Sequence, residues 1–313
     1  MLKGLILIED NLEEYIKTGK TPKGIKLLLK IFKKNNIETD LVNYKNIKFN
    51  LNQDNLKFTI NNKISANPDF VLSIIVPEPE NHDYYNIKKC FEYLNVKVIN
   101  LIDNVNLARN KFLTLVKIKN HLYNIKVPKT MEIKNLEDSK NIIQELGLPL
   151  VIKLNNGYGG EGISLIRNEI DLKHELKKIS LKEESYIAQE AIMTSTCRDV
   201  RIVILNNKFF YSFERYNPND FRSNKHQGGG FKDYNPSKDL INFAIKISKI
   251  LGLDYCGIDF LFGESDTFYL CEVNTFPGFS YILKKYDEGD NSFLDKIYYL
   301  LNYFFSKMIQ RQY

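Results

Sequence analysis

The sequence lacks the marks of several large classes of protein. Its four cysteines show no CxxC or other metal-ligand spacing, and Cys256 and Cys271 fall in strand patterns, where we expect small core residues rather than a disulfide. No apolar run approaches the length that spans a membrane. The opening segment 1–8 is too short for a signal peptide and fits a strand instead. We therefore expect a reduced, cytoplasmic protein with no membrane partner.

A strong excess of one charge is also missing. The 44 Lys and Arg residues against 38 Asp and Glu residues give a net charge of +6, dispersed along the chain. This balance permits an anionic substrate but is too mild to predict nucleic acid as a partner. An RNA-binding module is the alternative that the positive charge alone would support. With 313 residues, 43% of them hydrophobic, the chain is long enough for two or three domains with full-sized cores.

The first hundred residues alternate strand and helix patterns, which predicts a small α/β layer with parallel strands. The expected strands are 4–8, 38–44, 70–76 and 97–101, and the expected helices are 24–36 and 86–94. The polar segment 50–67 is expected to form a hairpin or a loop.

A second unit is expected from Asp103 and a third from Tyr186, with no internal repeat and no low-complexity segment. The second unit combines helices with short strands, and the third is mainly β-structure to Asn274. The expected helices are 107–123, 135–146 and 237–251, and the clearest strands are 149–154 and 163–166.

Two β-rich runs, YCGIDFLF and TFYLCEVN, are separated by the segment GESD, a pattern typical of a tight hairpin. We predict that the last two residues of GESD form the turn. Asp259 then faces Glu272 directly across the ladder. Two residues further along the same face, Gly257 faces Asn274 and leaves space beside it.

Two carboxylates placed directly opposite repel each other, so a fold retains such a pair when a positive group lies between them. The oxygen ligands of Asp259, Glu272 and Asn274 suit Mg²⁺ better than zinc, which favours His and Cys. The hairpin therefore predicts a magnesium site. The alternative is a solvated acidic face, against which the flanking apolar residues and the Phe-Pro-Gly exit argue.

The glycine-rich segment GYGGEG at 157–162 matches GxGxxG, but a dinucleotide fingerprint needs a helix directly after it, and a strand pattern follows here. A P-loop is excluded because no Gly-Lys-Ser/Thr follows. What remains is a glycine-tipped hairpin that can close over phosphates, as in protein kinases. The segments CRD and DF echo kinase signatures, but Leu rather than Gly follows DF, so a kinase is disfavoured.

Lys153 is the expected phosphate contact at the base of this hairpin. A compact cation on a flexible stem suits the phosphates of a nucleotide. The residue lies within the apolar run PLVIKL, which argues against the alternative of an exposed strand lysine.

Taken in order, the motifs between residues 103 and 282 resemble the ATP-grasp superfamily, specifically its RimK-type carboxylate–amine ligases. The matching segments are RNK at 109–111, PLVIKL at 149–154 with its glycine loop, QEAI at 189–192, RDVR at 198–201, ER at 214–215, DFRSN at 220–224, GG at 228–229, LGLD at 251–254, GID at 257–259 and EVN at 272–274 with Pro277-Gly278. Each segment is weak alone, and their shared order is the specific signal.

The resemblance implies an ATP-grasp fold of the α/β (α+β) class. It places an N-terminal α/β pre-ATP-grasp domain at 1–102, a central subdomain with the glycine-rich loop at 103–187, and a C-terminal subdomain with the Mg²⁺ site at 188–313. The two subdomains would clamp ATP. The implied cofactors are ATP and Mg²⁺, with two metal ions expected and Mn²⁺ able to substitute.

The resemblance also implies roles for individual residues. Asp259, Glu272 and Asn274 match the family's Mg²⁺ ligands, in agreement with the hairpin register. The implied catalytic residues are Arg215, which would face the acyl phosphate, Arg222 and Asn274. The implied nucleotide-binding residues are Lys111, Lys153, Gly159, Gly160, Glu190, Ile192, Asp199, Arg222, Ser223 and Asn224.

The implied activity is an ATP-dependent ligase that joins an amino acid, such as glutamate, to a peptide, a protein or a small carboxylate through an acyl phosphate. The chain departs from the family on the acceptor side, where Tyr216 stands in place of a second arginine and Gln227 in place of another. The acceptor therefore cannot be carried over from relatives. The alternative from another class is a non-catalytic ATP-binding protein of the same fold. Relatives often self-associate, and the sequence leaves the oligomeric state open.

Overall fold

The computed structural model describes residues 1–19, 21–53, 55–75, 81–134, 139–157, 162–221 and 229–309. The chain divides into two compact units, each made of separate stretches of sequence. The first unit comprises 1–105, 253–255 and 276–313, and the second comprises 106–252 and 256–275. The division into three domains stays a prediction.

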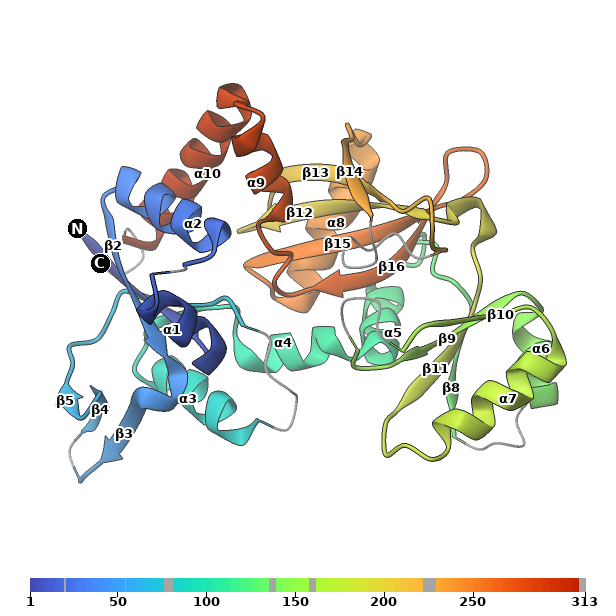
Figure 1. Cartoon of the computed structure of the whole chain (residues 1–313), viewed down its shortest axis with the longest axis horizontal. Helices are drawn as coiled ribbons and strands as arrows, with labels where there is room; N and C mark the ends of the chain where they lie inside the picture. Colours follow the sequence, from blue (N-terminus) through green and yellow to red (C-terminus); the bar gives the residue numbers. More distant parts are fainter. Residues whose placement is uncertain are drawn as a thin grey trace. The chain divides into compact units, whose positions relative to one another are not determined.

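The first unit is built on a four-stranded parallel sheet with the order β2-β1-β6-β7, of which Figure 1 labels β2. Its strands are β1 (Leu2–Ile8), β2 (Ile37–Asn43), β6 (Phe70–Ser73) and β7 (Lys97–Ile99). The helices of this unit are α1 (Asp10–Lys17), α2 (Lys23–Lys34), α3 (His82–Tyr93), α9 (Ser280–Asp287) and α10 (Asn291–Ile309). The sheet confirms the predicted parallel α/β layer.

Aromatic packing joins the N-terminal sheet to the C-terminal helix within this unit. The last five residues of β1 are buried, as expected for a strand covered on both faces. Phe32 of α2 lies 6.0 Å from the ring of Phe70 on β6 and 5.5 Å from the ring of Phe305 on α10. The core of the first unit therefore draws on residues from both ends of the chain.

A small antiparallel sheet with the order β3-β4-β5 completes the first unit. Its strands are β3 (Ile47–Leu51), β4 (Leu56–Ile60) and β5 (Lys63–Ile64), so the segment expected as hairpin or loop is a hairpin. Phe49 pairs with Phe58 across it and packs against the core of the unit.

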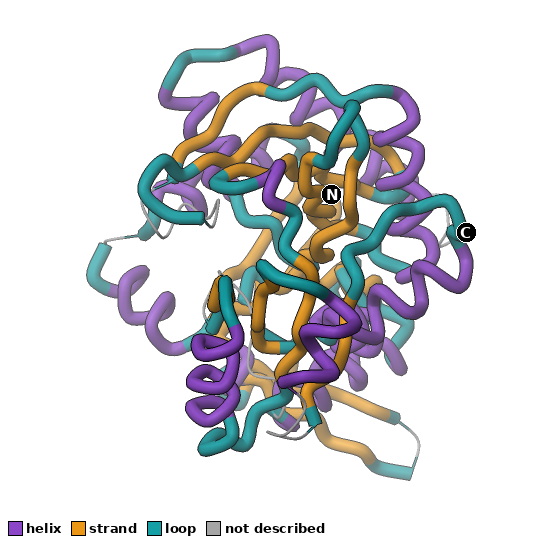
Figure 2. The backbone as a smooth tube through the Cα atoms, turned by 90° about the vertical axis from the view of Figure 1, so that its right-hand side faces the viewer, coloured by secondary structure: helices purple, strands orange, loops and turns teal. Residues whose placement is uncertain are grey.

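The second unit contains two sheets. The first has the order β10-β9-β11-β8, with antiparallel pairs throughout. Its strands are β8 (Thr130–Ile133), β9 (Leu150–Leu154), β10 (Ser164–Ile166) and β11 (Tyr186–Glu190). Helices α6 (Ser139–Leu146) and α7 (Glu169–Ile179) share one apolar core with this sheet. Figure 2 shows the backbone turned by 90° about the vertical axis from the view of Figure 1.

The other sheet of the second unit has five strands in the order β14-β13-β12-β15-β16. They are β12 (Arg198–Leu205), β13 (Lys208–Tyr216), β14 (Gly230–Asp233), β15 (Tyr255–Phe262) and β16 (Phe268–Asn274). Helix α8 (Lys238–Leu251) packs on β12 and β13, and its apolar side includes the fully buried Ala244 and Ile247.

The predicted single helix 107–123 is wrong. The chain forms α4 (Ile102–Arg109) and α5 (Lys111–His121), with Asn110 between them. The Asn110 side chain accepts a hydrogen bond of 2.9 Å from the Leu113 N–H, which makes it the N-cap of α5. An N-cap residue takes non-helical backbone angles, and this interrupts the helix. The break makes Lys111 the first residue of α5.

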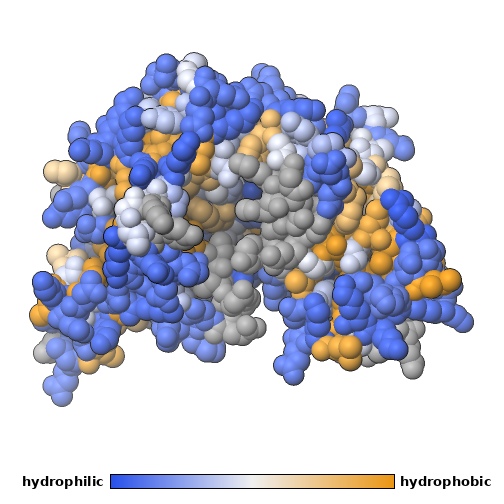
Figure 3. All heavy atoms as spheres, in the orientation of Figure 1, coloured by the Kyte–Doolittle hydropathy of each residue, from blue (hydrophilic) through white to orange (hydrophobic). Residues whose placement is uncertain are grey.

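Hydrophilic residues predominate on the face seen in Figure 3, and apolar residues show there in smaller groups. This agrees with apolar side chains gathered in the interior of each unit. In the described ranges, no helix combines the length and the hydropathy needed to cross a membrane.

Candidate nucleotide and metal site

The hairpin β15–β16 sets the spacing of the candidate site. Asp259 pairs with Glu272 and Gly257 pairs with Asn274, which confirms the predicted register at these positions. The predicted two-residue turn is wrong, because Gly263 donates a 2.7 Å hydrogen bond to the Thr267 carbonyl and three residues lie between them. The predicted register survives because of an irregularity further along the ladder.

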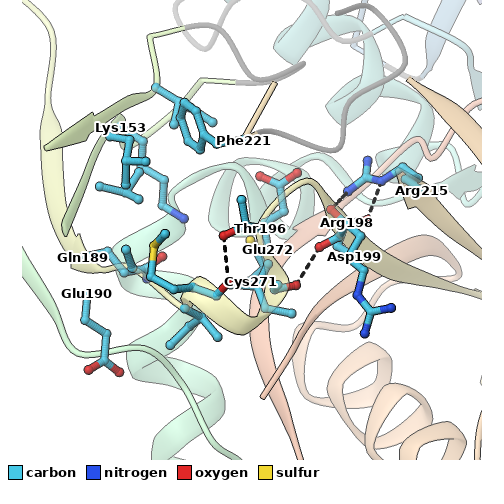
Figure 4. A pocket seen from close by; sticks show the side chains of 18 residues that line it. Lys153, Gln189, Glu190, Thr196, Arg198, Asp199, Arg215, Phe221, Cys271 and Glu272 are labelled. Carbon is cyan, nitrogen blue, oxygen red and sulfur yellow. Dashed lines mark hydrogen bonds and ion pairs between the residues drawn. The ribbon is translucent and has the colours of Figure 1, made fainter. Parts of the chain in front are cut away.

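A β-bulge at Cys271 reconciles the turn with the register. Phe260 pairs with Leu270 and Asp259 pairs with Glu272, so Cys271 is an extra residue on β16. A bulge sets two residues against one and redirects side chains that simple alternation would separate. As a result, Cys271 and the adjacent Glu272 both line the same pocket (Figure 4).

Asp259 of this hairpin belongs to a chain of four charged side chains in contact, in which negative and positive groups alternate. Arg215 donates two hydrogen bonds to Asp199, at 2.7 and 2.6 Å, and a third at 2.6 Å to Asp259. Arg201 donates two more to Asp259, at 2.6 and 2.7 Å. All four residues are buried, and the Asp259 side chain is fully inaccessible. Bidentate pairs of this kind fix the planes of carboxylate and guanidinium together.

Strand geometry explains how this chain of ions forms. Asp199 on β12 pairs directly with Arg215 on β13. Arg201 lies two residues beyond Asp199 and shares its face of the strand. Arg201 was not among the residues expected from the sequence. The sequence does contain a clue to its position: the spacing in RDVR places Asp199 and Arg201 on one side of β12.

Glu272 is the carboxylate of the hairpin that takes no part in these ion pairs. Among the described residues it accepts one hydrogen bond, of 3.3 Å from Asn274 Nδ2, and no cation lies within 4.0 Å of it. Burial raises its pKa, but the positive charges of Lys111, Arg215 and Lys153 outweigh burial and lower the pKa to about 2. Glu272 is therefore ionised and available to a cation.

The three predicted metal ligands lie together in the structure. Asn274 Nδ2 also donates to Asp259 Oδ2 at 3.0 Å, so a single amide group spans both carboxylates. No third His, Cys, Asp or Glu gathers with these carboxylates in the described part of the chain. The two carboxylates, together with the amide oxygen of Asn274 in place of its Nδ2, would make an all-oxygen donor set that fits Mg²⁺. Glu272 has open coordination capacity, whereas the oxygens of Asp259 are occupied by Arg201 and Arg215.

Two buried lysines flank this acidic group. Lys153 on β9 is 5% exposed, so the alternative of an exposed strand lysine is wrong. Its side chain extends into the pocket in Figure 4, and no hydrogen bond or ion pair ties its ammonium group to a described residue. Lys111 donates to the Gly157 carbonyl, and burial, aided by the charge of Lys153, lowers its pKa. Two buried cations beside one pocket favour an anionic ligand.

The pocket itself combines a charged end with an apolar wall. Of the predicted residues, those lining it are Lys153, Glu190, Ile192, Asp199, Arg215 and Glu272. Val151, Leu165 and Phe221 supply apolar surface that a planar base could contact. The predicted residues Gly159, Gly160, Arg222, Ser223 and Asn224 lie outside the described residues.

Glu190 faces the pocket from the end of β11, where two hydrogen bonds fix it. Its backbone N–H donates to the Lys129 carbonyl at 2.9 Å, and its Oε1 accepts from the Lys129 N–H at 3.0 Å. The Glu190 carboxylate is therefore held by the segment that precedes β8.

Comparison with known proteins places this site in a family. A model of the RimK-like ATP-grasp domain matches residues 108–291, more than half of the chain. Human N-acetylaspartylglutamate synthase A is 29% identical over 221 residues, which cover 68% of this chain and 55% of the synthase. The MG012 homolog of Mycoplasma pneumoniae is 30% identical over 194 residues, covering 59% of this chain and 66% of that protein. The chain thus spans less than two thirds of either relative.

Solved structures show the same fold at lower identity. A RiPP-associated ATP-grasp ligase of Chryseobacterium gregarium, in complex with ADP and a leader and core peptide, superposes with a TM-score of 0.69 at 16% identity over 96% of each chain. PsnB, an ATP-grasp ligase complexed with a phosphomimetic variant of its minimal precursor, Mg and ADP, gives 0.67 at 12% identity, covering 90% of this chain and 92% of PsnB. The chain belongs to the RimK-like ATP-grasp family and has the ATP-grasp fold. This is a family of carboxylate–amine ligases that use ATP and Mg²⁺.

Proposed function

We propose that the protein is an ATP-dependent ligase that forms an amide bond between a carboxylate acceptor and an amino acid. The observation that carries this proposal is the pocket that both Lys153 and Glu272 line: the buried Lys153 ammonium pairs with no carboxylate among the described residues, and the Glu272 carboxylate is ionised. A phosphate chain and its cation need both charges side by side. Structural ion pairs would instead have neutralised each other, as Asp199 and Arg215 do.

The reaction begins with attack of the acceptor carboxylate on the γ-phosphate of ATP, which gives an acyl phosphate and ADP. The amine of the donor then adds to the acyl carbon, and the tetrahedral intermediate expels phosphate and leaves the amide. Positioning and charge neutralisation supply most of the catalysis in such a transfer. We assign these tasks to Lys111, Lys153 and Arg215, with Arg222 and Asn274 as further catalytic residues.

We assign Mg²⁺ to Glu272, Asn274 and Asp259, as two ions with Mn²⁺ as a substitute. Bound there, the metal would act as a Lewis acid on the phosphates. Asn274 now presents its amide nitrogen to both carboxylates, so a half-turn of that amide would present its oxygen instead. Arg201 and Arg215 hold Asp259 in place in either arrangement.

The nucleotide base belongs, in this proposal, against the apolar wall of the pocket. Glu190, Ile192 and Asp199 would contact the nucleoside, and Gly159, Gly160, Ser223 and Asn224 would contact the phosphates or close over them. Exclusion of water protects an acyl phosphate from hydrolysis.

For the amine donor we propose glutamate. Relatives include N-acetylaspartylglutamate synthase A and β-citrylglutamate synthase B from human, and a probable α-L-glutamate ligase of Shewanella pealeana. For the acceptor we propose only a class, a carboxylate of a small metabolite or a peptide. The products named for the two synthases join glutamate to a small carboxylate, and PsnB is complexed with a precursor.

The test is ADP release from Mg-ATP with pooled amino acids and pooled carboxylates, with hydroxylamine added in a parallel reaction to trap the acyl phosphate as a hydroxamate. Glu272→Ala is expected to abolish ADP release. Glu264→Ala, on the exposed turn of the same hairpin, is the matched control and is expected to retain it.

ADP release that requires a carboxylate and yields a hydroxamate would support the ligase. Tight binding of Mg-ATP without ADP release for any small or peptide carboxylate would instead support the non-catalytic ATP-binding alternative. Full activity in Glu272→Ala would overturn the metal assignment.

A further inference from the structure

A second cavity of the 106–275 unit lies between α5, the segment 122–130 and Tyr269 of β16. It has a volume of about 720 Å³ and opens to solvent. None of its lining residues lines the pocket that contains Lys153, Glu190 and Glu272, which we call the nucleotide pocket. We call this cavity the α5 groove.

One wall of the α5 groove is a stripe along the helix. Phe112, Val116 and Lys119 follow one another at intervals of four and three residues, which places them on one face of α5, and Tyr123 lines the groove just beyond the end of the helix at His121. Val116 is 41% exposed and Tyr123 is 81% exposed. The opposite side of α5 carries Ile118, which is fully buried. The helix thus has apolar residues on its buried side and also, beside Lys119, on this partly exposed side.

The other wall is held in place by backbone contacts. The Leu270 N–H donates to the Lys126 carbonyl at 2.9 Å, which ties the segment 122–130 to β16. The Lys126 ammonium lies 5.6 Å from the centre of the Tyr269 ring. Lys119 donates to the Tyr123 and Ile125 carbonyls, at 2.7 and 3.0 Å, and fixes the exit of α5. The groove is therefore a formed feature of the chain.

The charge of the groove has one sign. Its lining includes Lys119, Lys126 and Lys129 and contains no Asp or Glu. Among the described residues, no carboxylate lies within 4.0 Å of the ammonium group of any of these three lysines, although the backbone N–H of Lys129 donates to Glu190 Oε1. Uncompensated lysines around a concave apolar surface create a positive potential that attracts anionic partners.

We propose that the α5 groove is a docking site for an acidic peptide segment that carries an apolar or aromatic side chain. The lysines pair with its carboxylates, and Phe112 and Val116 receive the apolar side chain. Asn120 and Asn124 offer polar groups for its backbone. Val116 and Val127 add aliphatic surface beside the aromatic Phe112, Tyr123 and Tyr269, and aliphatic contacts favour a peptide over single-stranded nucleic acid, which binds by stacking on aromatic faces alone.

The experiment measures fluorescence anisotropy of a labelled peptide of repeated Glu-Glu-Phe units with the full-length protein and no nucleotide. Peptides of Lys-Lys-Phe and Glu-Glu-Ser units test charge and apolar contact separately, and a labelled oligo(U) tests nucleic acid. We expect binding of the Glu-Glu-Phe peptide alone, weakened by salt.

The protein variants locate the site. Lys126→Glu combined with Lys129→Glu is expected to weaken binding at least about tenfold, and Val116→Ser is expected to weaken it by about threefold. Lys57→Glu combined with Lys63→Glu, two exposed lysines of the β3–β5 sheet, changes the net charge equally and is expected to leave binding unchanged.

Three results would overturn the proposal: no binding of the Glu-Glu-Phe peptide, equal weakening by the two double variants, or preferential binding of oligo(U) that the groove variant removes. Circular dichroism and urea unfolding of each variant identify any that fail to fold. Since no nucleotide is present, the outcome is independent of the ligase activity.

Discussion

Replacement of Arg201 by Leu tests whether the buried ions hold the second unit together. Arg201 donates two hydrogen bonds, of 2.6 and 2.7 Å, to a fully buried Asp259. Removing one partner of such a pair leaves an uncompensated charge and costs about 3–5 kcal/mol. Asp259 keeps its 2.6 Å bond from Arg215 and its 3.0 Å bond from Asn274, which places the expected loss near the lower figure, about 3 kcal/mol.

The assay is urea unfolding followed by circular dichroism. Arg198→Leu is the matched control on the same strand, because Arg198 is half exposed, lies 3.9 Å from Glu214 and stacks on Phe262. We expect a loss of about 1 kcal/mol or less there. Arg201→Lys keeps the charge and is expected to fall between the two.

A double-mutant cycle completes this test. Arg201→Leu combined with Asp259→Leu removes both charges, so its cost is expected to fall well short of the sum of the two single variants. Strict additivity, or a loss in Arg201→Leu no greater than in Arg198→Leu, would refute the reasoning.

Further predictions concern single side chains. Lys153→Met is expected to raise the KM for ATP about 10- to 100-fold, from loss of a charged contact worth about 1.5–3 kcal/mol, measured by ADP release; unchanged ATP kinetics would remove Lys153 from the site. Burial lowers the pKa of Lys88 from 10.5 to about 7, so the unfolded chain binds more protons between these values and stability is expected to rise with pH from about 7 to 10.5. Urea unfolding at several pH values checks this, and Lys88→Met should remove the rise. Burial raises the pKa of Cys271 to about 12, so iodoacetamide at neutral pH is expected to spare it, as mass spectrometry would show.

The hairpin with the predicted metal ligands shows how much of the site could be predicted from the sequence. Alternation along two strands placed Asp259 opposite Glu272, and the structure agrees. The agreement depended on two deviations that cancel, a turn one residue longer than expected and a bulge at Cys271. A bulge leaves no mark in the alternation of a short strand, because Cys tolerates both faces. The sequence was therefore enough to predict the register of Asp259 and Glu272, but not the length of the turn.

The pairing of the charged side chains was harder to predict from the sequence than the strands on which they lie. The sequence indicates that Asp199, Arg215 and Asp259 lie in one region, but strand order decides which cation meets which carboxylate. Arg201 became a partner of Asp259 because β12 neighbours β15 in the sheet. That neighbour relation joins strands about fifty residues apart and has no local signal.

The paired hydrogen bonds between Lys129 and Glu190 connect the α5 groove with the pocket that contains Lys153 and Glu272. Lys129 lines the α5 groove, Glu190 lines the nucleotide pocket, and their backbones and the Glu190 carboxylate meet at 2.9 and 3.0 Å. In thermodynamic terms, consider a ligand of the groove that displaces Lys129 and thereby changes nucleotide affinity by some factor. Linkage then requires nucleotide to change the affinity of that ligand by the same factor. Occupancy of either cavity could thus be read from titrations of the other.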